Sequence, residues 1–170
     1  MMGRAEHPEL WEFLEARHHG EVLSGTVAAI EPFGVFVALD DGPEHPVFPG
    51  VGFVAYPELA WRRFEAATEV VRVGGRVSGE FLVFDTTNLE ARLSLRALQP
   101  DPFQAFADDT AVGQQLPGRV IRSTPIGVFV EVADGVEGLV REPIGESRAG
   151  AAITVVVIGI DRERRRLTLA

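Results

Sequence analysis

Short runs of Val, Ile, Leu and Phe, separated by glycines and Asp-Gly pairs, make up most of the chain. Runs of this length that are bounded by turn residues are typical of β-strands. Within residues 113–170 they predict five strands, of which the last three are Val136–Val140, Ile153–Ile160 and Arg166–Leu169. Five strands are too few for a β-sandwich and match the number in a small closed barrel.

The first two of these strands have a counterpart earlier in the chain. Gly20–Gly42 (GEVLSGTVAAIEPFGVFVALDDG) and Gly113–Gly135 (GQQLPGRVIRSTPIGVFVEVADG) align without a gap, and both contain the block GVFV. Each copy of an internal repeat is one structural unit, so the alignment predicts a related barrel over residues 20–98.

The first copy contains more material than the second. Residues 43–52 (PEHPVFPGVG) form an insertion in the hairpin that joins its second and third strands, and its last two strands are predicted at Val77–Phe84 and Arg92–Leu95. The turn between these two strands is expected to be two residues longer than the turn that follows Asp161 in the second copy. We therefore expect the first barrel to be a diverged form of the second.

Two helical segments are predicted outside the barrels. Pro8 suits the first position of a helix, and Glu9 and Glu12 favour its positively polarised N-terminal end. Asp101 can cap a short helix that begins at Pro102. The expected order is an N-terminal helical segment (1–19), a first barrel (20–98), a helical linker (99–112) and a second barrel (113–170). The predicted fold class is all-β, with two five-stranded barrels in tandem.

The composition is that of a globular protein without disulfides. Hydrophobic residues make up 46% of the 170 residues and charged residues 24%, and there is no cysteine. A reducing, cytoplasmic compartment is therefore expected, and thiolate metal sites are excluded. No apolar run approaches the ~18 residues that are needed to span a bilayer, so we expect no membrane partner.

Acidic residues are concentrated in the first two thirds of the chain. The formal net charge is −9; residues 1–112 contain eight Arg and eighteen Asp or Glu, whereas residues 113–170 contain eight Arg and seven acidic residues. The first part repels a polyanion. Binding of such a ligand would depend on local clusters of arginine in the second part.

Catalytic and metal-binding motifs are lacking. The sequence contains no phosphate-binding loop, no nucleophile elbow and no zinc-helix motif. The four histidines, His7, His18, His19 and His45, do not have metal-ligand spacing, so surface positions are expected for them. We predict a protein that is not an enzyme and that uses neither a cofactor nor a metal.

The order of the motifs resembles the S1-type RNA-binding domain. The resemblance rests on a G-x-V strand, on the GVFV block, and on DGVEGLV and VVVIGIDRERRRLTL in the second copy. It covers the second copy over nearly its full length and the first copy at both ends. It implies two five-stranded OB-fold barrels that bind single-stranded RNA, without catalysis, in translation or RNA metabolism.

In the family that the chain resembles, two aromatic rings around an F-G-x-F element stand on the outer face of the barrel and stack on bases. The matching residues are Phe33 and Phe36 in the first copy and Phe129 in the second copy, where Ile126 replaces the other ring. Stacking of a base on an aromatic ring is worth ~1–3 kcal/mol and tolerates any base. On composition alone, Phe36 and Phe129 could equally lie in a barrel core.

The resemblance assigns the RNA-binding cations mainly to the second copy. This copy offers Arg119, Arg122, Arg141 and Arg165, together with Asp161. Arg141 replaces a family histidine, and Asp161 and Arg165 match the family's acid and the basic residue four places later. In the first copy Ala55 and Ala91 take the places of the histidine and the base. The run of arginines near the end of the chain could also be a solvated hairpin tip.

Two functions are compatible with these features. The first is weak, salt-sensitive and largely sequence-tolerant binding of single-stranded RNA, because a chain of net charge −9 repels its ligand at long range. The second is a protein-interaction module, in which the acidic first copy and its insertion 43–52 contact a partner protein. The arginines of the second copy favour RNA.

Overall fold

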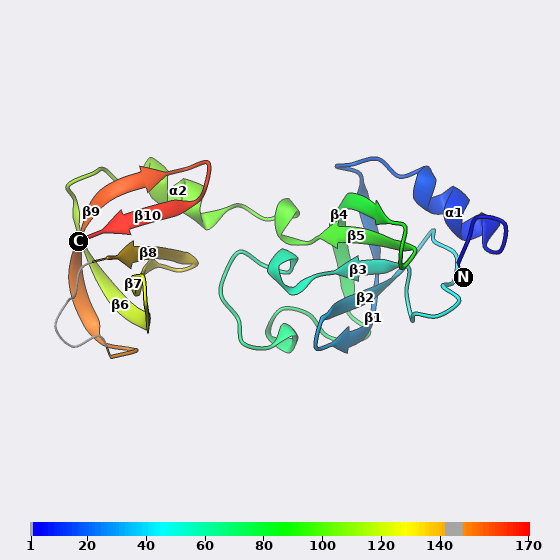
Figure 1. Ribbon diagram of the computed structural model, residues 1–170, viewed down its shortest axis with the longest axis horizontal. Helices are drawn as coiled ribbons and strands as arrows, with labels where there is room; N and C mark the ends of the chain where they lie inside the picture. The colour runs from blue at the N-terminus through cyan, green and yellow to red at the C-terminus, as the bar shows by residue number, and fades with distance from the viewer. Residues whose placement is uncertain (1, 142–147) are drawn as a thin grey trace. The chain divides into compact units, whose positions relative to one another are not determined.

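Both copies of the repeat fold into closed five-stranded β-barrels, in agreement with the predicted fold class (Figure 1). The computed structural model describes residues 2–141 and 148–170. The chain divides into two units, Met1–Pro100 and Asp101–Ala170, and each unit contains one barrel.

The first barrel consists of antiparallel strand pairs and closes through one parallel pair. Its strands are β1 (Val22–Glu31), β2 (Gly34–Leu39), β3 (Gly52–Val54), β4 (Arg76–Asp85) and β5 (Glu90–Ser94), in the order β1-β2-β3-β5-β4. β3 pairs with β5 in parallel, and β1 pairs with β4 in antiparallel orientation. Side chains alternate along β2, so that Val35 and Val37 lie in the barrel core with Leu93 of β5.

Short helices flank this barrel. The helix α1 (Pro8–Glu15) begins at the predicted proline and adds Leu10 and Leu14 to the core. It ends before the predicted segment does at residue 19. Trp11 of the same helix packs edge-to-face on Phe84 of β4, with ring centroids 5.1 Å apart. Single-turn 3-10 helices are η1 (Tyr56–Glu58), η2 (Ala67–Glu69) and η3 (Arg96–Leu98).

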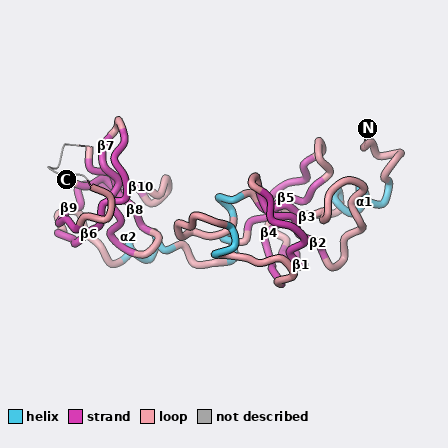
Figure 2. The backbone as a smooth tube through the Cα atoms, turned by 90° about the horizontal axis from the view of Figure 1, so that it is seen from below, coloured by secondary structure: helices cyan, strands magenta, loops and turns pink. Residues whose placement is uncertain are grey.

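The second barrel has the same arrangement of strands. They are β6 (Gln115–Thr124), β7 (Gly127–Ala133), β8 (Val136–Val140), β9 (Ala152–Asp161) and β10 (Arg166–Leu169), in the order β10-β8-β7-β6-β9. The helix α2 (Pro102–Asp108), which was expected in a linker, belongs to this unit, because Phe103 (2% exposed) and Ala107 lie in its core. Figure 2 shows α2 beside these strands. Asp101 caps α2 as predicted, accepting a hydrogen bond of 3.0 Å from the backbone N–H of Phe103.

The turns before the last strand have the same length in both barrels. Asp85 and Asp161 each pair with the residue five places later, so four residues form each turn. The last turn residues are Leu89 and Arg165, and both have a positive φ, of 55° and 52°. The expected lengthening of this turn in the first copy is therefore wrong.

The pairing register gives the reason for this difference. Arg92 of β5 lies opposite Phe53 of β3, and Thr168 of β10 lies opposite Leu139 of β8, which is the equivalent position in the second barrel. By this register Leu89, rather than Ala91, corresponds to Arg165. The similar triplets LSL and LTL near the ends of the two copies are offset by two residues, and only the strand pairing reveals the offset.

Candidate nucleic-acid interface

The phenylalanine of each GVFV block lies on the outer face of its barrel. In β7, Val128 and Val130 belong to the core, while Phe129 between them lies outside the core cluster and is half-buried. In β2, Phe36 is likewise absent from the core cluster that contains both of its valine neighbours. The alternation of side chains along a strand explains both positions.

Phe129 lines a groove in the second barrel in which several predicted site residues come together. The groove has a volume of ≈350 Å³, and its lining includes the apolar residues Ile126, Phe129 and Leu139 and the arginines Arg141, Arg165 and Arg166. Arg122 lies over the ring of Phe129 in a cation–π contact, with its Cζ atom 4.2 Å from the ring centroid. An aromatic surface with arginines around it can hold a base and the phosphate next to it.

Arg165 is tied to the start of α2. Two hydrogen bonds of 2.8 Å join its guanidinium group to Asp101, and its Cζ atom lies 5.6 Å from the ring centroid of Phe103. Burial raises the pKa of Asp101, but hydrogen bonds from Arg165 and from the backbone N–H of Phe103 outweigh this effect and hold the pKa below its usual value. The positive charge that Arg165 adds to the groove is therefore accompanied by a carboxylate.

Two further arginines of this unit are paired. Arg162 lies 2.7 Å from Asp108, and Arg122 lies 3.4 Å from Glu137. Asp161 accepts a hydrogen bond of 3.1 Å from a backbone N–H of the turn that follows it, so it shapes this turn. The cationic surface expected from the sequence is thus partly neutralised.

The positive charge of the second unit that is not in these ion pairs comes from five arginines. Arg119, Arg141, Arg148, Arg164 and Arg166 form no ion pair with another described residue. Arg141 and Arg166 line the groove, whereas Arg119 lies on β6 outside its lining. The groove therefore keeps two arginines that form no ion pair with a described carboxylate, although Glu137 also lines it.

In the first barrel, the predicted stacking residue Phe36 is covered. It is only 3% exposed, although it lies on the outer face. Phe48, from the insertion between β2 and β3, stacks on it with ring centroids 5.2 Å apart and planes 21° apart. Phe53 of β3 also packs edge-to-face against it, with ring centroids 5.3 Å apart. The expectation that Phe36 offers its face to solvent is wrong here, because the insertion supplies a ring that covers it.

The other predicted ring of this barrel remains accessible. Phe33 is 62% exposed, and its ring lies nearly parallel to that of Phe53, with centroids 6.1 Å apart. Arg92, which the sequence analysis did not select, places its Cζ atom 4.9 Å from the Phe53 centroid and pairs with Asp85 at 3.1 Å. The first barrel thus has a cation beside its rings.

Phe48, Phe53 and Arg92 are site residues that the sequence motifs did not identify. The aromatic ring within the proline-rich insertion 43–52 was the available indication for Phe48. Arg92 could not be found from the motifs, because its place above Phe53 depends on the parallel pairing of β5 with β3.

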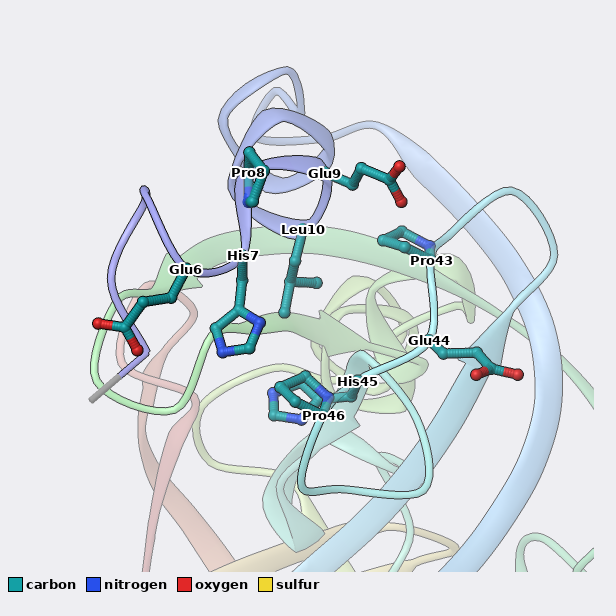
Figure 3. Close-up of a pocket in the computed structure, with 9 residues that line it drawn as sticks. All are labelled: Glu6, His7, Pro8, Glu9, Leu10, Pro43, Glu44, His45 and Pro46. Carbon is teal, nitrogen blue, oxygen red and sulfur yellow. The ribbon is translucent and has the colours of Figure 1, made fainter.

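A hollow of ≈620 Å³ lies in the first unit between the start of α1 and the loop that follows β2 (Figure 3). It is lined by residues 6–10 and 43–46, with His7 and Leu10 on the helix side and His45 and Pro46 on the loop side. Among residues 2–141 and 148–170, no group of three or more His, Asp or Glu side chains is placed to hold a metal ion. Within that same part of the chain, no helix has the length and apolarity to cross a membrane.

Comparison with known proteins gives a family for this arrangement. A family model described as S1 RNA binding domain matches residues 18–96, which include the first barrel. The small ribosomal subunit protein bS1 of Mycolicibacterium smegmatis is 38% identical over 170 residues, covering 94% of this chain and 34% of that protein. The bS1 protein of Neisseria meningitidis serogroup B is 32% identical over 168 residues, covering 92% and 28%. The chain spans about one third of the length of the curated relatives that it matches.

A solved structure, GSP13 from Bacillus subtilis, matches with a TM-score of 0.40 and 25% identity over 56% of this chain and 73% of that chain. The family match, the repeated GVFV motif and the two closed barrels agree with one another. The chain folds into two tandem barrels of the OB fold, and its residues 18–96 match the S1 RNA binding domain family.

Proposed function

We propose that the chain binds single-stranded RNA through the groove of its second barrel, without catalysis, as part of the translation apparatus in the cytoplasm. The matched family is an RNA-binding domain and the matched relatives are small ribosomal subunit proteins, which supports this class of function. The observation that carries the proposal is the groove itself, in which the half-buried ring of Phe129 lies near Arg141 and Arg166.

The groove suits a flexible nucleic acid strand. A base can stack on Phe129 while Ile126 and Leu139 shield it from water, and the planar guanidinium groups at the groove can bind its phosphate. Stacking does not distinguish one base from another, so we expect little sequence preference. The net charge of −9 opposes association at long range, so we expect weak and salt-sensitive binding.

Fluorescence anisotropy with a labelled single-stranded RNA of about 12 nucleotides, at low salt, tests this proposal. Phe129→Ala should weaken binding roughly 5- to 150-fold, because it removes ~1–3 kcal/mol of stacking. Arg141→Glu should abolish binding, since it places a negative charge in the groove. Arg141 is a cleaner choice than Arg165, whose replacement would also leave Asp101 without its partner.

Matched controls lie outside the groove. Ile158→Ala truncates an apolar side chain on β9 that is 52% exposed, and Arg148→Glu makes the same charge change at another exposed site. Absence of binding at high micromolar wild-type protein, or equal losses in the controls, would reject the proposal. A partner protein that still binds the Arg141→Glu chain would instead support the alternative role of the acidic first barrel as an interaction module.

A further inference from the structure

The connection between the second and third strands differs between the two barrels. In the first barrel it is the covering loop, residues 40–51, which carries Phe48 onto Phe36. In the second barrel it consists only of residues 134 and 135, and Phe129 stays half-buried beside its groove. The same position of the repeated motif is therefore covered by a loop ring in one barrel, whereas in the other it is half-buried with the side chain of Arg122 over it.

His45 fixes the conformation of the covering loop. Its Nδ1 atom accepts hydrogen bonds from the backbone N–H groups of Val47 (3.1 Å) and Phe48 (3.0 Å), and its Nε2 atom donates one of 2.8 Å to the carbonyl oxygen of Asn88. The His45 ring also lies 4.8 Å from the ring of Phe48. One side chain thus sets the turn that presents Phe48 and joins this turn to the β4–β5 connection.

The two ends of the loop are anchored, because Asp40 binds Arg76 and the buried Val51 accepts a hydrogen bond of 2.8 Å from the backbone N–H of Ala91. The middle of the loop has space beside it. The hollow of ≈620 Å³ separates residues 43–46 from the start of α1 (Figure 3), and a second hollow of ≈360 Å³ is lined by residues of β2 and of the loop, including Phe48. Pro43, Pro46 and Pro49 have no backbone N–H to donate to the barrel. Lifting the middle of the loop, residues 43–49, requires separation of the Phe48 stack and loss of the His45 hydrogen bond to Asn88, while the anchored ends stay in place.

We propose that Phe48 is an intramolecular occupant of a nucleobase-stacking site on the first barrel, and that this site binds single-stranded RNA only when the covering loop lifts. The uncovered surface would present Phe36 next to the exposed Phe33, with Arg92 beside Phe53. A phenylalanine ring in parallel contact uses the same π-face that a base would use. The inference rests on the proposed function in taking RNA as the ligand of these outer faces.

The experiment uses the full chain, in which Phe129→Ala and Arg141→Glu disable the groove of the second barrel. Phe48→Ala in this background removes the covering ring and is expected to tighten binding of a labelled oligouridine by roughly 5- to 150-fold, the worth of one stacked base. The measurement is made at about 0.15 M salt, where repulsion by the acidic first unit is screened beyond ~8 Å. His45→Ala releases the loop in a second way and should act in the same direction.

Three controls complete the design. Val47→Ala alters a loop side chain that is 67% exposed and should change nothing. Phe36→Ala added to Phe48→Ala should reverse the gain, because it removes the face that was uncovered. Trp11 and Trp61, the two tryptophans of the chain, lie in the first unit, so their fluorescence reports whether each variant keeps this unit folded.

Each outcome separates this inference from the proposed function. If the wild-type chain binds RNA but folded Phe48→Ala and His45→Ala chains gain nothing, the covering loop is a structural element only and the inference is wrong. If the wild-type chain fails to bind and Phe48→Ala confers binding, the inference stands and the assignment of the second groove is wrong. If neither the wild-type chain nor the Phe48→Ala chain binds RNA, the inference and the proposed function are both wrong.

Discussion

At the scale of single residues, Asp101 combines a structural role with a place beside the proposed interface. It caps α2 through the backbone N–H of Phe103 and binds Arg165 through two hydrogen bonds of 2.8 Å. The cap could be predicted from the sequence, because Asp before Pro is a local pattern. The pair with Arg165 could not, because the two residues are 64 positions apart and meet only through the docking of α2 on the second barrel.

Asp101→Asn should remove the ion pair with Arg165 and keep the helix cap, since asparagine is also a good N-cap residue. We expect the free energy of unfolding of the second unit to fall by about 1–2 kcal/mol at neutral pH. Urea unfolding followed by far-UV circular dichroism detects both units, whereas tryptophan fluorescence reports the first unit alone. The dichroism transition should move and the fluorescence transition should not.

The difference in the free energy of unfolding between the wild-type and Asp101→Asn chains should depend on pH, because the pKa of Asp101 is lowered in the folded state. A carboxyl whose pKa is lower in the folded state stabilises the fold above its unfolded pKa, and this stability is lost as the pH falls through the folded value. The wild-type and Asp101→Asn curves should therefore converge below about pH 4. Asp109→Asn, an exposed change at the other end of α2, serves as the control. Parallel curves at all pH values would contradict the assigned role.

At the scale of the elements, the sequence predicts where strands lie better than how they pair. β8 and β10 have the predicted bounds, because Asp-Gly turns and β-branched runs mark strand ends locally. The register of β5 is set only when the barrel closes. This register shows that Leu89, and not Ala91 as predicted, corresponds to Arg165. The outer position of Phe36 follows from strand alternation, but its cover depends on a loop without periodic pattern.

Gly34 allows β2 and β3 to bring their aromatic rings together. A β-carbon at this position would collide with the ring of Phe53 and approach the carbonyl oxygen of Val54. We expect Gly34→Ala to destabilise the first unit by about 1–3 kcal/mol, as measured by urea unfolding followed by far-UV circular dichroism, which detects both units. Gly159→Ala in β9 is the matched strand control, since its nearest neighbours lie at an ordinary 3.6 Å. Equal effects of the two changes would show that close packing at Gly34 does not matter.

At the scale of the whole molecule, net charge is a poor guide to the binding surface. Residues 1–100 contain eight Arg and fifteen acidic residues, and residues 101–170 contain eight Arg and ten acidic residues. The charge of +1 counted for residues 113–170 becomes −2 for the folded second unit, because α2 contributes Asp101, Asp108 and Asp109. Affinity for RNA therefore depends on arginines that lack a carboxylate partner.

The salt dependence of RNA binding measures how many such arginines take part. The two arginines of the groove that form no ion pair with a described residue, Arg141 and Arg166, should give a slope of log K against log salt of about −1.4, at ~0.7 per phosphate contact. Arg141→Ala should reduce the magnitude of the slope by ~0.7, and Arg148→Ala should leave it unchanged. Affinity that does not vary with salt would rule out phosphate contacts as a source of binding.

The unequal β2–β3 and β7–β8 connections also bear on valency. Under the proposal, the closed loop leaves the groove at Phe129 as the stacking site for RNA among the described residues, and the chain would act as a monovalent binder. With the loop lifted, two faces joined by one polypeptide could engage the same strand, and the second contact would be made at high effective concentration. Discrimination between short and long transcripts would then arise from avidity, under the control of a single phenylalanine.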